Sequence, residues 1–256
     1  MPHSKRSNYN DRNFQLLLFR RSSEPDDLVT GLPTFLQPLS REALVRFLKK
    51  ALIPARYRPR LRRWLRPNDP ESNVHWCRVV MNRDIERFIR SLDCSHIDAL
   101  EISGAGSQGR YNFRSYRTVQ YPDYDVCREP LRREQFDLII AEQVFEHVLR
   151  PDRAAANVYD MLRSGGVFVI STPFLLKVHG APLDLCRWTE HGMRQLLETA
   201  GFTVINTASW GNRECLSADM TPGLDWTLYD PLRHSLINEP QFPIVVWAFA
   251  EKRKSE

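Results

Sequence analysis

Several features that would indicate a secreted, membrane or zinc-binding protein are missing from this chain of 256 residues. It has only five cysteines, an odd number, and none of them form a Cys-x-x-Cys pair, so neither a disulfide framework nor a zinc site is predicted. The polar start lacks the apolar core of a signal peptide, and no later apolar run reaches membrane-spanning length. We therefore expect a cytoplasmic protein.

The net charge of +5 is not concentrated on one predicted working face. Arginines gather in the first third of the chain, chiefly between Arg56 and Arg66, while the rest mixes both signs. We therefore expect no nucleic-acid partner. The segment from Arg56 to Arg66 is compatible with peripheral membrane contact or with an anionic acceptor, but packing along the protein surface is favoured, because arginine stems commonly lie on protein.

Two regions of different character meet at Pro67 and Pro70. Residues 1–70 predict an irregular arm and a basic helical extension, with an amphipathic helix beginning near Ser40 and stopping before Pro54. Residues 71–256 predict a single larger domain, since 42% hydrophobic residues over the chain can supply a core.

The second region alternates apolar runs with helical patterns. The apolar runs are residues 97–102, 136–141, 165–172, 202–205 and 242–250, and the helical patterns are residues 74–91, 151–162 and 189–200. This alternation predicts an α/β fold: a Rossmann-like, doubly wound, mostly parallel sheet with an antiparallel C-terminal edge strand and an N-terminal helical extension. The ligand site of such a sheet lies at the carboxyl ends of its strands.

A glycine turn, Glu101-Ile-Ser-Gly-Ala-Gly-Ser-Gln-Gly109, directly follows one predicted strand. Its glycines let the backbone turn sharply and approach a ligand closely. The pattern alone fits the pyrophosphate of a dinucleotide as well as it fits a nucleoside cofactor. The turn therefore predicts where a cofactor lies without identifying it.

Three motifs in the expected order resemble class I S-adenosylmethionine-dependent methyltransferases of the type 11-like kind. Residues 100–106 resemble the first motif, with Ser103 in place of the more common glycine. Residues 137–148 resemble the fourth strand and following helix, and residues 163–170 resemble the next signature, with Ser164 in place of proline. The resemblance implies S-adenosyl-L-methionine as the cofactor.

The resemblance also implies a set of cofactor-binding residues. Glu101 and the glycines would approach the methionine part, Gln120 or Asp123 the ribose hydroxyls, and the pair Asp125-Val126 the adenine. The full set is Glu101, Gly104, Ala105, Gly106, Gln120, Asp123, Asp125, Val126, Glu142 and Gln143.

The sequence departs from the family between Gly109 and Phe136, where the interval is too short for the usual helix, second strand, helix and third strand. We place a second strand near residues 116–120 and a minimal third strand near residues 124–127.

Residues 179–193 resemble a segment of methyltransferases that act on glycans and small molecules. The implied reaction is O-methylation of a small molecule or saccharide, with N-methylation left open. No metal is predicted, because the sulfonium activates its own methyl group, but a hydroxyl acceptor needs a base. His179 and His147 are the candidate bases, and Asp184 would orient one of them or bind the substrate.

Two alternatives remain at this stage. One is a nicotinamide-dependent oxidoreductase that uses the same glycine turn. The other is a non-catalytic interaction protein of the same fold, which the short interval after Gly109 makes conceivable.

Overall fold

The computed structural model describes residues 73–131, 133–180, 183–221 and 226–253. The strands are β1 (Asp98–Ile102), β2 (Ser115–Val119), β3 (Phe136–Glu142), β4 (Leu162–Pro173), β5 (Thr203–Trp210) and β6 (Val245–Glu251). The α-helices are α3 (Val79–Ser91), α4 (Pro151–Met161), α5 (Glu190–Thr199) and α6 (Arg213–Asp219), and the short 3-10 helices are η4 (Trp76–Arg78), η5 (Cys94–His96) and η6 (Phe145–His147). The predicted extension over residues 1–70, with Arg56 to Arg66, lies outside the described residues.

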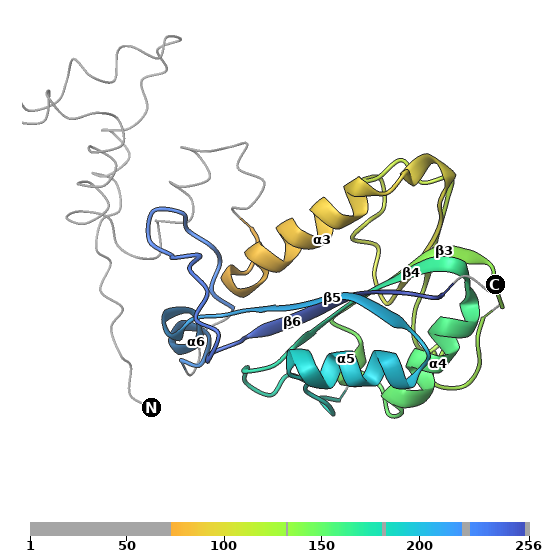
Figure 1. The fold of residues 1–256 in the computed structure, drawn as a ribbon. Helices are drawn as coiled ribbons and strands as arrows, with labels where there is room; N and C mark the ends of the chain where they lie inside the picture. Colours follow the sequence, from red (N-terminus) through yellow and green to blue (C-terminus); the bar gives the residue numbers. More distant parts are fainter. Residues whose placement is uncertain (1–72, 132, 181–182, 222–225, 254–256) are drawn as a thin grey trace, which may run out of the picture. The chain divides into compact units, whose positions relative to one another are not determined.

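The strands form one sheet in the order β2-β1-β3-β4-β6-β5, which confirms the predicted doubly wound class. Figure 1 shows α3 on one face of this sheet and α4 and α5 on the other. β1 pairs in parallel with β2 and β3, and β3 pairs in parallel with β4. The C-terminal strand β6 is antiparallel, as predicted; it lies between β4 and β5, so that β5 forms the edge. The segments that follow β1, β2, β3 and β4 therefore meet at the carboxyl edge of the parallel strands.

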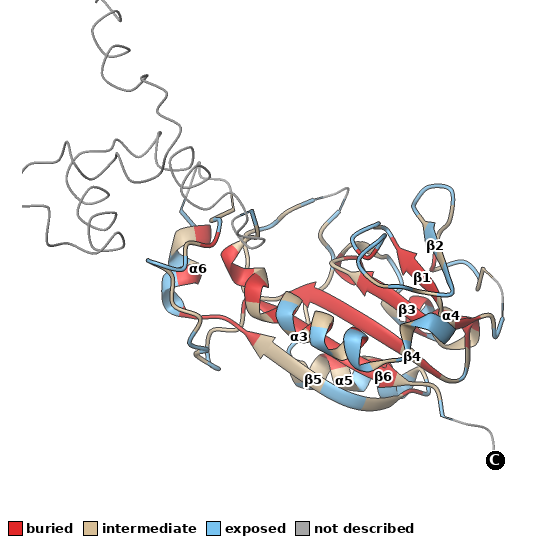
Figure 2. Ribbon diagram, turned by 90° about the horizontal axis from the view of Figure 1, so that it is seen from above, coloured by how far each residue is buried: buried red, intermediate tan, exposed pale blue. Residues whose placement is uncertain are grey.

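Helices cover both faces of the sheet because its central strands are apolar on both sides. Alternate residues of β6 belong to two separate cores, which contain Val246, Ala248 and Ala250 on one side and Val245, Trp247 and Phe249 on the other. The first core includes residues of α4 and α5, and the second includes residues of α3. Figure 2 shows the central strands buried between the helices, while β2 and β5 are more exposed.

The helices α3, α4 and α5 lie within the predicted helical ranges, whereas α6 was not predicted. Pro151 stands at the first position of α4, where its missing N–H costs no hydrogen bond. The Thr189 side chain caps α5 by accepting from the N–H of Gly192 at 3.2 Å. None of the described helices is both long and apolar enough to cross a lipid bilayer.

The interval between β1 and β3 holds one strand, β2, which matches the predicted second strand. The predicted third strand near residues 124–127 is wrong. The N–H of Tyr124 donates to the Gln120 carbonyl, and the N–H of Cys127 donates to the Asp125 carboxylate, both at 2.9 Å. These local bonds form turns in place of a strand ladder. Residues 103–114 form a turn over 106–110 within an irregular loop, without a helix after the glycine turn.

Candidate functional site

Glu101, near the carboxyl end of β1, holds the glycine turn in place. Its buried carboxylate accepts hydrogen bonds from the N–H of Gly106 at 2.8 Å, the N–H of Ser107 at 2.9 Å and the hydroxyl of Tyr116 at 2.6 Å. A buried carboxylate is stable when donors satisfy it in this way. The turn is therefore fixed onto the end of the strand by one charged side chain.

Glycine is required at the centre of this arrangement. A Cβ on Gly104 would lie 2.5 Å from Oε1 of Glu101, which is closer than real Cβ atoms come to oxygen. Ser103 has a φ of +57°, in the left-handed region that favours glycine, which agrees with the glycine usually found there in the resembling family. Ala105 and Gly106 are exposed, so the turn offers backbone to a ligand at the carboxyl edge.

The residues predicted to hold the nucleoside follow β2, the strand beside β1. Gln120 and Asp123 are exposed. Asp125 uses one carboxylate oxygen to accept from the N–H of Cys127. Val126 is buried, and its carbonyl accepts from the side-chain amide of Asn157 at 2.7 Å. The structure brings the residues after β2 to the same edge of the sheet as the glycine turn. Their contacts with the cofactor stay predictions.

Glu142 and Gln143 mark the end of β3. Burial, reinforced by the negative charge of Glu101, raises the pKa of the Glu142 carboxyl. Gln143 has a φ of +56°, and its backbone N–H donates to the Ser171 carbonyl at 2.8 Å. Two acidic side chains from neighbouring strands thus act on each other at the carboxyl edge, and this negative potential suits a cationic ligand.

The helix expected after β3 is shortened to the single turn η6, which is tied to the loop before α5. The Glu146 carbonyl accepts from the N–H of Leu185 at 2.7 Å and from that of Cys186 at 3.3 Å. The Nδ1 of His147 donates to the Leu183 carbonyl at 2.5 Å. These contacts fix the positions of Glu146 and His147, the two polar residues of η6.

The carboxyl group of Glu146 is unusual. The residue is 0% exposed, and neither carboxylate oxygen has a hydrogen-bond partner among the described residues. Its Oε1 lies 3.6 Å from Nε2 of His147. Burial raises the pKa of Glu146 to about 7. A buried carboxyl without a hydrogen bond is costly, so this group needs a reason to be there.

His179 follows β4, and Asp184 holds its loop. The Asp184 carboxylate accepts from the backbone N–H of His179 at 2.9 Å and forms a two-point ion pair with Arg187. The Arg187 guanidinium holds the pKa of Asp184 below its usual range, whereas burial lowers the pKa of His179. Asp184 contacts the backbone of His179, so the predicted orienting role is one of positioning the loop.

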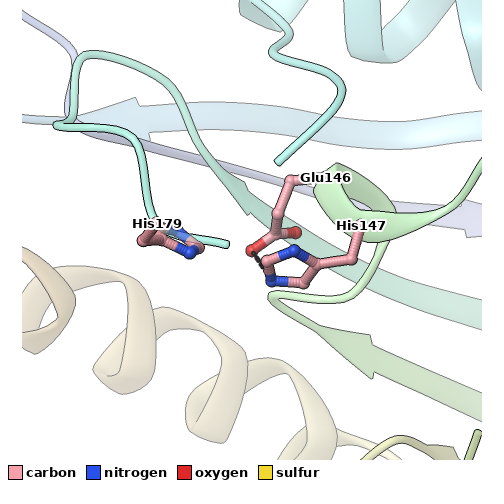
Figure 3. A group of neighbouring side chains, drawn as sticks. All are labelled: Glu146, His147 and His179. Carbon is pink, nitrogen blue, oxygen red and sulfur yellow. Dashed lines mark ion pairs between the residues drawn. The ribbon is translucent and has the colours of Figure 1, made fainter. Parts of the chain in front are cut away.

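Figure 3 shows the Glu146 carboxylate against the imidazole ring of His147, with the ring of His179 facing them from the loop after β4. The two ring centroids are 5.1 Å apart. One nitrogen of each ring and one carboxylate oxygen all lie within 4.8 Å of one another. The structure therefore brings the two predicted histidines together. The structure also places Glu146 beside them, a residue that was not among the predicted site residues. The sequence pattern that could have pointed to it is an acidic residue within the mostly apolar stretch from Val144 to Val148.

Residues 86–170 match the family model of the methyltransferase domain. That stretch, from within α3 to within β4, is similar to a methyltransferase domain. This confirms the predicted resemblance over β1, β2, β3 and most of β4, whereas His179 and Asp184 lie beyond the matched residues.

One curated relative of the methyltransferase domain is named "Probable S-adenosylmethionine-dependent methyltransferase" and comes from Mycolicibacterium smegmatis. It is 31% identical over 100 residues, which are 35% of this chain and 39% of the relative. The match thus spans well under half the length of that relative.

Solved structures with a similar arrangement include the [4+2]-cyclase SpnF, at 14% identity and a TM-score of 0.46 over 68% of this chain and 81% of that chain. Another is the 1,6-didemethyltoxoflavin-N1-methyltransferase of Burkholderia thailandensis, with bound 1,6-didemethyltoxoflavin and S-adenosylhomocysteine. It has 14% identity and a TM-score of 0.45 over 69% of this chain and 82% of that chain.

Proposed function

We propose that this chain transfers the methyl group of S-adenosyl-L-methionine to a hydroxyl of a small molecule or saccharide. The observation that carries the proposal is the glycine turn packed on Glu101, in a chain whose residues 86–170 match the methyltransferase domain. The name of the Mycolicibacterium smegmatis relative supports the same cofactor.

The residues at the carboxyl edge fit this cofactor. When bound, it supplies a methyl group that its own sulfonium charge has activated. Glu101 and Glu142 give the edge a negative potential, which attracts a cation. The glycine at position 104 leaves the backbone close to Glu101, where a side chain would collide. The exposed backbone of Ala105 and Gly106 would then face the methionine part.

The acceptor would lie at the loops that follow β3 and β4. His147 and His179 would take up the proton of the acceptor hydroxyl there, with His179 as the favoured base. Burial lowers the pKa of His179, so its ring stays neutral at neutral pH and keeps a lone pair for a proton. Asp184 would set the position of His179 through the backbone.

Exposed apolar side chains lie beside the histidines in the sequence. Val178 is 85% exposed, Leu149 is 74% exposed and Leu183 is 50% exposed. Val178 precedes His179, and the Leu183 carbonyl contacts His147. This surface favours an acceptor that has an apolar part next to its hydroxyl.

The nicotinamide alternative is not favoured. A dinucleotide fingerprint places the pyrophosphate on the N-terminus of the helix that follows the glycine turn. Residues 103–114 of this chain form a turn within an irregular loop and lead directly into β2, without such a helix. The donor array that would bind a pyrophosphate is therefore missing from this stretch.

Calorimetric titration with S-adenosylhomocysteine and with NAD tests the proposal. We expect micromolar binding of S-adenosylhomocysteine and no binding of NAD. Binding of NAD alone would instead support the oxidoreductase, and binding of neither would support the interaction protein. A screen of hydroxyl acceptors with His179→Ala beside the wild type then tests the base, because full turnover by this variant would remove His179 from that role.

A further inference from the structure

We propose that Glu146, His147 and His179 form a binding site for a divalent transition-metal ion, of the Zn²⁺ class, at the carboxyl edge of β3 and β4. The sequence predicted no metal, because methyl transfer itself requires none. Three observations support this site: a buried carboxylate without a hydrogen bond from the described residues, the orientation of one imidazole, and the distances among the three side chains.

The Glu146 carboxylate is fully buried, and no described residue donates a hydrogen bond to either oxygen. Arg187 acts on this carboxyl through space, but its donors go to the Asp184 carboxylate and the Cys186 carbonyl. Buried carboxylates are normally hydrogen-bonded, ion-paired or bound to a metal. Both oxygens of Glu146 are therefore available to a ligand that the protein itself does not supply.

The hydrogen bond of His147 decides which ring nitrogen faces Glu146. A carbonyl oxygen can only accept, so the Nδ1 that contacts the Leu183 carbonyl carries the proton. In the neutral ring, Nε2 then presents a lone pair to Oε1 of Glu146, 3.6 Å away. Two acceptors that face each other need a proton or a metal ion between them, and 3.6 Å is too long for a hydrogen bond through a shared proton. Histidines that ligate metals commonly donate their other ring N–H to a backbone carbonyl, as His147 does.

The distances fit a small coordination shell. Zn²⁺ binds histidine nitrogen and carboxylate oxygen at roughly 2.0–2.2 Å, so tetrahedral ligand atoms lie roughly 3.4 Å apart. The 3.6 Å between His147 and Glu146 is close to that value, and the whole set lies within 4.8 Å. His179 lies on a loop after β4, so a side-chain movement there can shorten the longest distance without shifting the sheet.

Two histidines and one carboxylate form a ligand set typical of catalytic zinc, which keeps a coordination position open for water or substrate. If the proposed methyl transfer holds, a cation here would lower the pKa of the acceptor hydroxyl, and His179 would act as a ligand and not as the free base. Metal binding itself does not depend on the proposed function, so the two can fail separately.

The test is calorimetric titration of the full chain, free of any affinity tag and stripped with EDTA, with ZnCl₂ alone. We expect one equivalent of Zn²⁺ to bind at micromolar concentration or below. Glu146→Gln and His147→Ala are each expected to weaken binding by more than about 100-fold, which exceeds the usual effect of residues outside the ligand shell. Titration with Co²⁺ is expected to give an absorption spectrum of nitrogen and oxygen ligation, without a thiolate band.

Two matched variants serve as controls. His191→Ala removes an exposed histidine of α5 that does not belong to the proposed metal site. Cys186→Ser removes a thiol from the loop before α5, whose backbone contacts Glu146. Both are expected to bind Zn²⁺ like the wild type. The nearly isosteric Glu146→Gln should retain the far-UV circular dichroism of the folded chain, so that loss of binding is not loss of fold. Absence of Zn²⁺ binding, or binding that Cys186→Ser abolishes and Glu146→Gln does not, would overturn the proposal.

Discussion

Glu101 and Glu146 are both buried glutamates at the carboxyl edge of the sheet, yet their surroundings are opposite. Glu101 accepts from two backbone N–H groups and one tyrosine hydroxyl. Glu146 accepts from none of the described residues. The first carboxylate is satisfied by the fold and stabilises it, whereas the second is tolerated by the fold at a cost. Hydrogen bonding, more than burial, therefore separates a structural carboxylate from one that is available to a ligand.

Replacing Glu101 should produce the largest loss of stability. In Glu101→Gln the charge is lost, and the new amide NH₂ faces groups that are themselves donors. Because hydrogen bonds to a charged acceptor contribute about 1.5–3 kcal/mol each, we expect the free energy of unfolding to fall by about 2–4 kcal/mol, measured by urea denaturation.

Tyr116→Phe is the graded control for this variant, since it removes only one of the three donors. Its expected loss is about 1.5 kcal/mol, the lower end of the range for one hydrogen bond to a charged acceptor. An equal loss in the two variants would mean that the backbone bonds to Gly106 and Ser107 contribute little, contrary to the role assigned to Glu101.

The matched change at the second glutamate should have the opposite sign. In EDTA, near pH 8, Glu146→Gln is expected to raise the free energy of unfolding by about 1–2 kcal/mol, because a neutral amide is less costly to bury than an unpaired carboxylate. With excess Zn²⁺ the order should reverse, since only the wild type would gain binding energy.

The difference in stability between the wild type and Glu146→Gln should depend on pH. The pKa of Glu146 is raised by burial from the ordinary 4.5 to about 7, so the folded chain keeps the proton to higher pH than the unfolded chain. The penalty at Glu146 is thus absent below about pH 4, grows as the pH rises through this range, and is complete above about pH 7. In thermal unfolding, the higher stability of Glu146→Gln relative to the wild type should therefore be absent near pH 4 and largest above about pH 7. The same difference in stability at both pH values would contradict this prediction.

A third carboxylate, that of Asp98, lies at the opposite edge of the sheet. Asp98 begins β1 and is paired with Arg114 and Arg163, and the hydrogen bonds from Arg114 chiefly hold its pKa below the ordinary 3.8. Its stabilisation is therefore present above about pH 4 and is lost as the pH falls further. Asp98→Asn is expected to cost less than about 1 kcal/mol near neutral pH, because the pair is partly exposed. Urea unfolding at acidic pH should show this difference shrinking; an undiminished difference would indicate packing and not charge.

Periodicity and local signals predicted most of the domain. All six strands and three of the four described α-helices match predicted elements. Five of the strands and the three helices were found from apolar periodicity and caps, which act within each element. The helix α6 was missed, since its seven residues have no long apolar period. The false strand near Asp125 arose because side-chain contacts to the backbone, which form turns, are not visible in an apolar pattern.

Only those parts of the site that have a local sequence pattern were predicted. The glycine turn and the two histidines carry recognisable motifs, but Glu146 becomes notable only through what surrounds it. Its carbonyl is bonded by Leu185 and Cys186, nearly forty residues further along the chain, while its carboxylate is left without a donor. A missing partner is a property of three-dimensional packing, so no local pattern could have revealed it.

The place of β6 also sets the order in which the domain can be completed during synthesis. β4 and β5 each pair with β6 and not with one another. While the ribosome is still producing residues 245–251, the β5 segment has no strand to join, and one side of β4 stays open. The sheet is complete only when β6 pairs with both β4 and β5. Until then the nascent chain exposes an apolar edge, which is the kind of surface that chaperones protect.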